Sequence, residues 1–454
     1  MQGVTRVNRL VAGLDLGSTG IKILIADEHG AEVAIRQRPT PWRNGPGGTT
    51  TLVAEDLLAT IQDLFHDIAS LLENASASPS KVAAIAASGM GETGFLLTSD
   101  GSAAGPAYAW FDPHGQEQAA ALPANLRAEF AGRTGLPWGV QVSTAKILYL
   151  RDEGITLTGK QWVNLPEFVV EALGGQRSAE YSLASRTGLL DQDTGEPWTE
   201  MLDYIGVDTE FLPQLVDAGT PLGQATAAWV PPIFSGAHLT VAGHDHLVSA
   251  VSGGAISNDR YHVSMGTAEV LLRVIESPLS FEARRRLGDA LINCVRHVVP
   301  GQHVLVAGVK TGLLMRRALQ MFGISDLDGR TRLDDAVMAL GDSQLAEGSI
   351  EVRGARNDDG VLSLVIRSDG ISPAEVFKAI LDHGNDEIGL LIEAMDREVP
   401  PATSSLLTGG WASMRSVQAA RSQVLPSLEV SERSQDTAYG ATVFAAQLLK
   451  ANRA

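Results

Sequence analysis

The chain has 454 residues, with 35 Lys and Arg against 53 Asp and Glu, so its net charge at pH 7 is −18, and 44% of its residues are hydrophobic. This composition excludes a disordered chain, and the acidic balance argues against nucleic acid as a partner because no basic surplus offsets phosphate repulsion. The single cysteine, Cys294, excludes a disulfide framework and a zinc site of several thiolates.

Length and hydropathy bear on domain number and location. At roughly 150 residues per domain, the length allows about three domains or two large ones. No apolar stretch reaches the ~18 residues of a membrane span, and Asp15 interrupts the first apolar run too early for a signal peptide. We therefore expect a cytoplasmic protein without a membrane partner.

The first half alternates short apolar runs with turns. Strands are expected at residues 11–16, 21–25, 31–37 and 82–87. Residues 55–73 carry apolar side chains at helical spacing and predict an amphipathic helix. Residues 95–110 are expected to form a hairpin across Ser99-Asp100-Gly101. A further strand is expected to end at Gly243, directly before His244-Asp245-His246.

The opening pattern returns in the second half. Residues 261–265 and 270–274 predict two strands, so that Asp15-Leu-Gly-Ser-Thr and Ser264-Met-Gly-Thr-Ala form one internal repeat. Ser372, Pro373 and Glu375 predict a capped helix that reaches Met395 and is interrupted near Gly384. The remaining expected elements are helices at 313–322, 413–421 and 437–450 and a strand at 405–408.

The turn Gly17-Ser18-Thr19-Gly20 is the first candidate site. Its backbone N–H groups and two hydroxyls can converge on one anion. The sequence around this turn does not contain the Walker A motif. A Rossmann turn would lead into a helix, whereas residues 21–25 alternate in hydropathy as a strand does. The sequence therefore favours a phosphate-binding hairpin, with an ordinary hairpin turn as the alternative.

Two charged residues flank this turn. Asp15 ends an apolar strand, and burying it unpaired would cost on the order of several kcal/mol unless Mg²⁺ or bound water compensates the charge. Lys22 lies two residues beyond the turn. It either faces phosphate or lies on a solvated strand face.

Asp245 is the strongest candidate for a general base, because it follows a strand and open α/β sheets bind ligands at the C-terminal ends of their strands. His244 and His246 are expected to hydrogen-bond nearby backbone, since a His-Asp-His metal site lacks further ligands at a fixed spacing. A serine nucleophile is excluded because Ser88-Gly89-Met90-Gly91 does not match G-x-S-x-G.

Three loops carry groups suited to a small polar or flat ligand. Glu92 and Asp112 each follow a predicted strand and could accept hydrogen bonds from hydroxyls; for Asp112, turn chemistry before Pro113 is the alternative. The turn Thr408-Gly409-Gly410-Trp411 would let a flat ring approach the backbone, unless it is a plain strand–helix connection.

Eight motifs, in order along nearly the whole chain, resemble the FGGY family of carbohydrate kinases, which includes xylulose, fuculose and glycerol kinases. They are Asp15-Leu-Gly-Ser-Thr-Gly-Ile-Lys22, Ser88-Gly-Met-Gly-Glu-Thr93, Ala109-Trp-Phe-Asp112, Ala179-Glu-Tyr-Ser-Leu-Ala-Ser185, Gly243-His-Asp245, Ser264-Met-Gly-Thr267, Leu407-Thr-Gly-Gly410 and Ala438-Tyr-Gly-Ala441. Each motif is weak alone, and their order carries the resemblance.

The resemblance implies an α/β fold of two ribonuclease H-like, actin-like ATPase domains around a catalytic cleft, with residues 8–252 binding sugar and residues 253–450 binding nucleotide. Asp245 would be the catalytic base, and Asp15 would help to hold Mg²⁺. The residues implied to contact the sugar are Met90, Glu92, Trp110, Asp112 and Asp245. The residues implied to contact ATP are Gly17, Ser18, Thr19, Lys22, Gly266, Thr267, Gly409, Gly410 and Trp411.

Three departures from the family pattern leave the substrate open. The loop Met90-Gly91-Glu92-Thr93 resembles that of glycerol kinases more than the Met-His pair of xylulose kinase-like members. His114 stands where many members have Arg. Trp411 replaces the third glycine of a common Thr-Gly-Gly-Gly run, where it would either crowd the adenine pocket or stack on the ring.

The sequence thus predicts ATP-dependent phosphorylation of a hydroxyl of a small sugar or polyol, with a ketose as the first expectation. The alternatives are an actin-like or chaperone-like ATPase and a non-catalytic sugar sensor on the same fold. Glu92, Trp110 and Asp112 favour the kinase over the ATPase, and the presence of both Asp15 and Asp245 argues against the sensor. A homodimer is left open.

Overall fold

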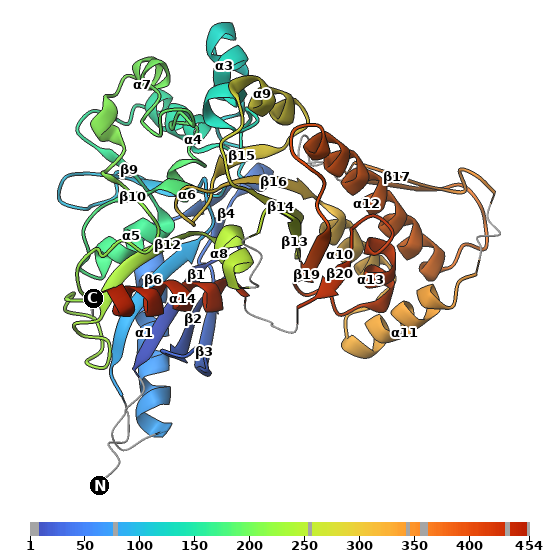
Figure 1. The fold of residues 1–454 in the computed structure, drawn as a ribbon, viewed down its shortest axis with the longest axis horizontal. Coiled ribbons are helices and arrows are strands. Elements are labelled where there is room, and N and C mark those ends of the chain that lie inside the picture. The colour runs from blue at the N-terminus through green and yellow to red at the C-terminus, as the bar shows by residue number, and fades with distance from the viewer. Residues whose placement is uncertain are drawn as a thin grey trace. The chain divides into compact units, whose positions relative to one another are not determined.

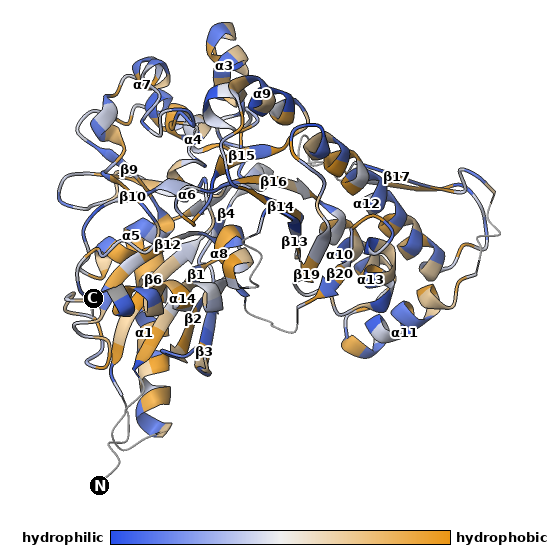
Figure 2. Cartoon of the chain, viewed as in Figure 1, coloured by the Kyte–Doolittle hydropathy of each residue, from blue (hydrophilic) through white to orange (hydrophobic). Residues whose placement is uncertain are grey.

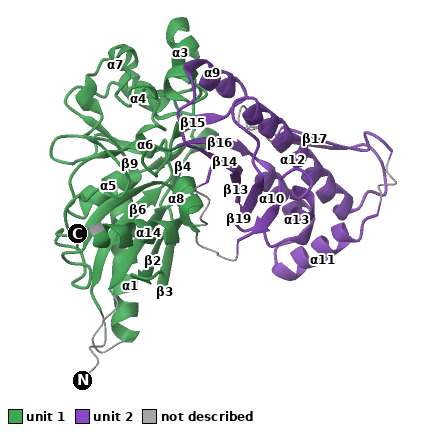
Figure 3. Ribbon diagram, viewed as in Figure 1, with its two compact units in different colours: residues 1–252, 295–302, 435–454 green, residues 253–294, 303–434 purple. Residues whose placement is uncertain are grey.

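The structure, a computed structural model, describes residues 9–75, 80–252, 257–341, 346–354, 362–431 and 436–451. The chain divides into two compact units (Figure 3): unit 1 holds residues 1–252, 295–302 and 435–454, and unit 2 holds residues 253–294 and 303–434. Unit 2 therefore differs from the expected second domain, because residues 295–302 and the last helix group with unit 1. The expected domain limits at residues 8 and 253 lie outside the described residues.

Unit 1 is built on a five-stranded sheet in the order β12–β6–β1–β2–β3 (Figure 1). Its strands are β1 (Leu10–Leu16), β2 (Gly20–Asp27), β3 (Glu32–Pro39), β6 (Val82–Gly89) and β12 (His238–His244). β2 is antiparallel to β1 and β3, whereas β6 is parallel to β1 and β12. The C-terminal ends of β1, β6 and β12 therefore meet at one edge of the sheet.

Helices cover both faces of this sheet, which explains why β1 and β6 are nearly continuous apolar runs (Figure 2). α1 (Ala54–Ala75) and α5 (Leu165–Ala172) contribute to the hydrophobic core of unit 1. α14 (Asp436–Ala451) contacts β1, β6 and β12. A Cβ atom at Gly13 of β1 would lie only 2.1 Å from the Ala438 carbonyl oxygen, so glycine lets α14 pack directly on the strand. This packing places the end of the chain in unit 1.

Unit 2 repeats the strand order of unit 1. Its sheet runs β15–β16–β14–β13–β19–β20, formed by β13 (Arg260–Met265), β14 (Glu269–Ile275), β15 (Asn293–Arg296), β16 (His303–Val309), β19 (Ser404–Thr408) and β20 (Leu428–Val430). β14 is antiparallel to β13 and β16, whereas β19 is parallel to β13 and β20. The internal repeat is thus one of topology: β1, β2, β3, β6 and β12 correspond to β13, β14, β16, β19 and β20.

The other elements surround these sheets. The core of unit 2 is completed by α10 (Thr311–Met321), α11 (Leu327–Met338), α12 (Pro373–Asp396) and α13 (Arg415–Arg421). Short elements are β4 (Arg43–Asn44), β5 (Thr50–Leu52), β7 (Gly94–Leu97), β8 (Ala107–Tyr108), β9 (Gln161–Asn164), β10 (Ala179–Glu180), β11 (Leu215–Val216), β17 (Ile350–Arg353), β18 (Ser363–Ile366), α2 (Gln116–Ala121), α3 (Ala124–Thr134), α4 (Ser143–Asp152), α6 (Tyr181–Ala184), α7 (Thr199–Ile205), α8 (Asp245–Ser252) and α9 (Phe281–Asp289), with 3₁₀ turns at Pro46–Gly48 and Thr209–Phe211. None of the described helices combines the length and apolar character that crossing a bilayer requires.

Two predictions of local structure are wrong. The expected hairpin at 95–110 is present only beside its turn, where Leu97 pairs with Ala103; beyond it β7 pairs with β9 and β8 pairs with β5 instead of with each other. The expected interruption of α12 at Gly384 is also missing, since the helix is continuous. A Cβ atom at Gly384 would lie 2.7 Å from Nη2 of Arg421, so this glycine serves close packing.

Candidate active site

The three parallel strands of unit 1 bring acidic residues to one edge of its sheet. Asp15 lies opposite Ser88 in the β1–β6 register, and His244 lies opposite Gly89 in the β12–β6 register. The loop after β6 carries Glu92, and Asp245 is the first residue of α8, directly after β12. Adjacent parallel strands end side by side, so these positions converge as the sequence predicts for a ligand site.

Asp245 is held in its ionised form. The His246 main-chain N–H donates to Asp245 Oδ1 at 2.7 Å, and His244 Nε2 lies 3.4 Å from the same oxygen. Burial acts to raise the pKa of Asp245, but the nearby His246 side chain and that N–H bring the pKa below its ordinary value. Oδ2 receives no hydrogen bond from the described residues, so one carboxylate oxygen is left to accept a proton.

His244 does not follow the backbone role expected for its ring. Its Nε2 faces Asp245, and its buried Nδ1 has no hydrogen-bond partner among the described residues. Burial lowers the pKa of His244 to about 3. The ring is therefore neutral at physiological pH and leaves the negative charge of Asp245 in place.

Asp15 is a buried carboxylate with one cationic neighbour. Its exposed fraction is 5%, and Lys22 Nζ lies 3.4 Å from its Oδ2. Burial and the charge of Asp245 together raise the pKa of Asp15 to about 6 in spite of Lys22. Lys22 therefore contacts Asp15 rather than lying on a purely solvated strand face.

The carboxylates at this sheet edge suit an open Mg²⁺ site better than a metal site closed by several protein ligands. Across the described ranges, no group of three or more His, Cys, Asp or Glu side chains is arranged to hold a metal. Mg²⁺ is usually bound through one or two carboxylates together with waters and substrate phosphates. Asp15, a buried carboxylate whose pKa is raised in part by the charge of Asp245, fits that pattern as a single carboxylate ligand.

Glu92 pairs with an arginine that the sequence did not single out. Arg186 Nε donates to Glu92 Oε1 at 2.7 Å, and Arg186 Nη2 donates to the same oxygen. Burial raises the pKa of Glu92, partly offset by Arg186. The two residues are 94 positions apart, so no local pattern indicates the pair.

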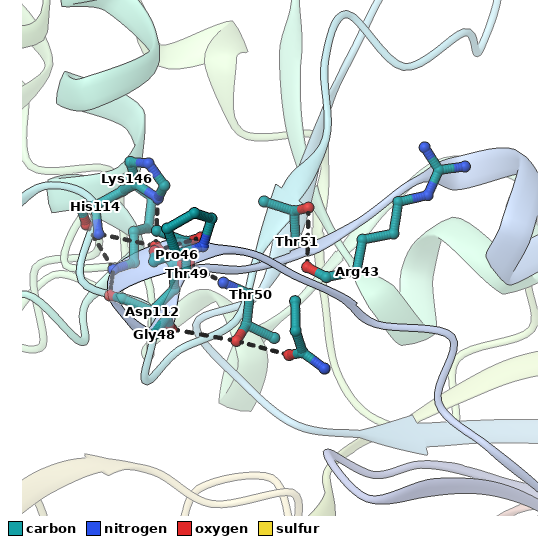
Figure 4. A network of polar contacts seen from close by, with 10 residues as sticks. Arg43, Pro46, Gly48, Thr49, Thr50, Thr51, Asp112, His114 and Lys146 are labelled. Carbon is teal, nitrogen blue, oxygen red and sulfur yellow. Dashed lines mark hydrogen bonds and ion pairs between the residues drawn. The ribbon is translucent and has the colours of Figure 1, made fainter.

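Asp112 takes part in a buried turn network, and its predicted contact with the sugar stays a prediction. Its side chain is fully buried, Oδ1 accepts from the His114 N–H at 2.8 Å and lies 2.6 Å from His114 Nδ1, and Oδ2 accepts from the Thr50 N–H. Figure 4 shows this network, in which Lys146 binds the Asp112 main-chain oxygen. The turn role that the sequence left open for Asp112 is therefore present.

The other residues expected at the sugar contribute mainly apolar surface. Met90 is 4% exposed and belongs to the core of unit 1. Trp110 is partly buried against that core and packs edge-to-face on Phe111, with ring centroids 5.2 Å apart. Trp110 is thus the more accessible of the two to a ligand.

The Gly17–Gly20 turn of unit 1 has the form of an anion-binding hairpin. Thr40 Oγ1 donates to the Gly17 carbonyl at 2.6 Å, and Trp42 Nε1 donates to the Ser18 carbonyl at 2.7 Å. The N–H groups of Ser18 and Thr19 have no acceptor in the described chain. With the carbonyls held by neighbours, these N–H groups are free to bind phosphate.

Unit 2 carries the matching hairpin beside a cavity. The cavity of about 530 Å³ is lined by residues that include Gly266, Gly410, Trp411, Arg316 and Arg330. Trp411 Nε1 donates to the Gly266 carbonyl at 3.1 Å, and the Arg330 guanidinium lies over the indole ring, 4.5 Å from its centroid. Gly409 has φ +93°, and a Cβ there would lie 2.5 Å from the Met265 carbonyl oxygen. Trp411 thus forms one wall of the cavity without filling it, although Thr267 and Gly409 do not line it.

Comparison with known proteins identifies the family. The model of the N-terminal domain of the FGGY family of carbohydrate kinases matches residues 10–251, more than half of the chain. The chain is 28% identical over 138 residues to a rhamnulokinase of Enterococcus faecalis, covering 29% of the chain and 28% of the relative. It is 23% identical over 329 residues to a gluconokinase of Bacillus subtilis, covering 71% and 61%. The matches thus span less than two thirds of either relative.

The fold is shared along the whole chain. A crystal structure of Plasmodium falciparum glycerol kinase with ADP superimposes with a TM-score of 0.83 at 15% identity, covering 98% of this chain and 90% of that one. The structure is therefore an α/β fold of two ribonuclease H-like, actin-like units, as the sequence predicts.

Proposed function

The chain belongs to the FGGY family of carbohydrate kinases, and from this we propose that it transfers the γ-phosphoryl group of ATP to a hydroxyl of a small sugar or polyol. The observation that carries the proposal is Asp245, an ionised carboxylate at a strand end with one oxygen left free. Glu92 and Asp15 lie at the same sheet edge, and a phosphate-type hairpin begins beside Asp15.

In the proposed mechanism, Asp245 Oδ2 accepts the proton of the acceptor hydroxyl. At the same time the hydroxyl oxygen of the acceptor bonds to the γ-phosphorus of ATP, and the bond between the γ-phosphorus and the β–γ bridging oxygen breaks. The pKa of Asp245, lowered by the His246 side chain and N–H, keeps the base unprotonated at neutral pH. Its charge also orients the hydroxyl. Because little covalent work is left to the protein, orientation supplies much of the rate.

In this proposal, backbone N–H groups and a metal ion stabilise the negative charge of the phosphates. The N–H groups of Ser18 and Thr19 bind the transferring group, and Lys22 supplies a positive charge nearby. Asp15 would hold Mg²⁺, which neutralises phosphate charge when bound. Gly266, Thr267, Gly409, Gly410 and Trp411 are assigned to ATP, and the cavity beside Gly266 is large enough for a nucleoside.

The acceptor is expected to be small and rich in hydroxyls. Glu92 accepts hydrogen bonds through Oε2, because Oε1 is used by Arg186, and Trp110 supplies an apolar surface. The narrower prediction of a ketose, made from the sequence, stays a prediction that the likeness to a rhamnulokinase supports. The likeness to gluconokinase is the reason to test sugar acids as well.

The test is ATP-dependent product formation on a panel of ketoses, polyols and sugar acids, followed by phosphate analysis of each product. A kinase phosphorylates at least one acceptor and consumes ATP in proportion. ATP hydrolysis without any phosphorylated acceptor would instead support the ATPase alternative. Acceptor binding without phosphorylation would support the sensor.

Glu92→Gln separates the acceptor side from the nucleotide side. Hydrogen bonds to a charged group contribute ~1.5–3 kcal/mol, so the Michaelis constant for the acceptor should rise by ~10-fold or more while that for ATP stays within ~2-fold. Unchanged acceptor dependence with impaired use of ATP would move Glu92 to the nucleotide side and contradict its proposed role.

A further inference from the structure

Residues 180–186 contact both functional loops of unit 1, yet the mechanism above gives them no role. Ser182 Oγ accepts a hydrogen bond of 3.0 Å from the His244 N–H, the residue directly before Asp245. Four residues further along, Arg186 binds Glu92. One short segment thus contacts the peptide that carries the base and the side chain assigned to the acceptor.

The Ser182 hydroxyl is oriented by a buried acidic chain. Its proton is donated to Glu180 Oε2 at 2.5 Å, and the same oxygen accepts from the Leu183 N–H at 3.1 Å. The Glu180 N–H in turn donates to Glu167 Oε1 at 2.7 Å. Because the hydroxyl proton is used by Glu180, a lone pair of Ser182 Oγ is directed to the His244 N–H.

Glycines shape both functional loops to this segment. A Cβ atom at Gly243 would lie 2.6 Å from Ser182 Oγ and 3.0 Å from Glu180 Oε2. A Cβ atom at Gly91 would lie 2.7 Å from Arg186 Cγ. Any side chain at either position would push the loop away from residues 180–186, so both contacts depend on the glycine.

We propose that residues 180–186 are the positioning element of the active site, in which Ser182 fixes the main chain that carries Asp245 and Arg186 fixes the carboxylate of Glu92. The inference rests on the proposed roles of Asp245 and Glu92. Neither Ser182 nor Arg186 touches the reacting atoms in this scheme. The two contacts should therefore act on different kinetic constants: Ser182 on kcat, and Arg186 on the Michaelis constant of the acceptor.

Ser182→Ala tests the first contact, with Ser185→Ala as its matched control. Ser185 is equally buried in the same segment, but its hydroxyl accepts from Gln192 Nε2 at 3.2 Å and does not contact His244. A displacement of about 1 Å at a reacting group can cost ~10²-fold. We expect kcat to fall by ~10–100-fold in Ser182→Ala, with the acceptor Michaelis constant within ~3-fold, and no comparable loss in Ser185→Ala.

Arg186→Met tests the second contact, with Arg177→Met as its control. Arg177 forms a similar partly buried pair, with Nε 2.9 Å and Nη2 2.7 Å from the two oxygens of Glu171. We expect Arg186→Met to raise the acceptor Michaelis constant by ~10-fold or more, with the Michaelis constant for ATP unchanged. Arg177→Met should leave both constants unchanged.

The outcomes distinguish this inference from the proposed function. A wild-type protein that phosphorylates no acceptor overturns the proposed function itself. An active wild type in which Ser182→Ala behaves like Ser185→Ala, or in which both test variants lose kcat and acceptor affinity alike, overturns the positioning element alone. If Ser182→Ala does not fold, Ser182→Cys keeps the side-chain size but offers the His244 N–H only a weak acceptor: a selective loss of kcat supports the inference, and wild-type kcat contradicts it.

Discussion

The two sheets share one order of five strands, but they differ in the side chains near the C-terminal ends of the first and fifth strands. Among the described residues, unit 1 has carboxylates at these positions and unit 2 does not. The repeat aligns Asp15 of β1 with Ser264 of β13, and the first residue after the fifth strand is Asp245 in unit 1 but Ser431 in unit 2. Asp15 has Lys22 as its cross-strand partner, whereas Ser264 has Val270. A shared topology thus sets where loops lie, and the side chains at strand ends decide which unit can supply a base or a metal ligand.

Buried charge also differs between the units. In unit 2, Arg421 and Glu269 are 0% and 1% exposed and form two hydrogen bonds of 2.6 and 2.8 Å, and Arg421 also bonds Asn385 and the Leu381 carbonyl. In unit 1, burial leaves the pKa of Asp15 raised to about 6 in spite of Lys22. A satisfied buried pair is typical of a structural role, whereas an incompletely compensated carboxylate indicates a functional site.

The largest effect is expected from substitution of the residue that follows the fifth strand of the unit 1 sheet. Asp245→Asn should lower kcat by ~10²–10⁴-fold, because the general base is lost, while nucleotide binding stays near wild type. Ser431→Ala, at the corresponding position of unit 2, should leave kcat near wild type. Steady-state kinetics on the best acceptor, with calorimetric titration of nucleotide, would measure both. Near wild-type turnover in Asp245→Asn would remove the base from the mechanism.

The buried pair of unit 2 should respond in stability. Arg421→Met leaves Glu269 buried without its partner, so the free energy of unfolding should fall by ~3–5 kcal/mol. The double variant Glu269→Leu/Arg421→Met should recover part of that loss, since no charge is left unpaired. Denaturant unfolding followed by circular dichroism provides the measurement. A loss below ~1 kcal/mol in the single variant would mean that solvent reaches the pair.

The first strands offer a matched pair for metal dependence. Asp15→Asn should raise the Mg²⁺ concentration needed for half-maximal rate by at least ~10-fold, since even outer-sphere changes cost ~10–100-fold in metal affinity. Because the pKa of Asp15 is raised to about 6, protons should compete with Mg²⁺ as the pH falls through about 6. That competition should be absent in Asp15→Asn and intact in Ser264→Ala. An Mg²⁺ requirement identical in all three proteins would rule Asp15 out as a ligand.

A pH dependence of stability is expected from two buried glutamates of unit 1. Burial raises the pKa of Glu167 to about 8 and that of Glu180 to about 7, so the folded chain holds protons that the unfolded chain has released. Stability should therefore fall as pH rises from about 5 toward 8, by roughly 1.4 kcal/mol per pH unit for each group still protonated when folded. Denaturant midpoints of wild type and Glu167→Gln should converge at low pH. A stability that rises with pH in Glu167→Gln and wild type alike would contradict the shift.

Several parts of the site were predictable because their signals are local. The glycine turns at residues 17–20 and 266–268, the apolar runs beside them and the capped start of α12 each depend on a few neighbouring residues. The place of Asp245 followed from its position after an apolar strand. The internal repeat was visible because each copy needs the same strand–turn–strand spacing.

Other features depended on contacts between distant residues, which no local pattern records. The sequence alone determined the alternation of strands and helices, the two glycine hairpins and the candidate acids, because hydrophobic period and turn chemistry act within a few residues. Only the tertiary structure decided that the Asp112 carboxylate binds Thr50 and His114, and that Arg186 binds Glu92. Only packing decided that α14 returns to β1. In each case the partner is chosen by shape and burial across the fold, and those are set when the whole chain is packed.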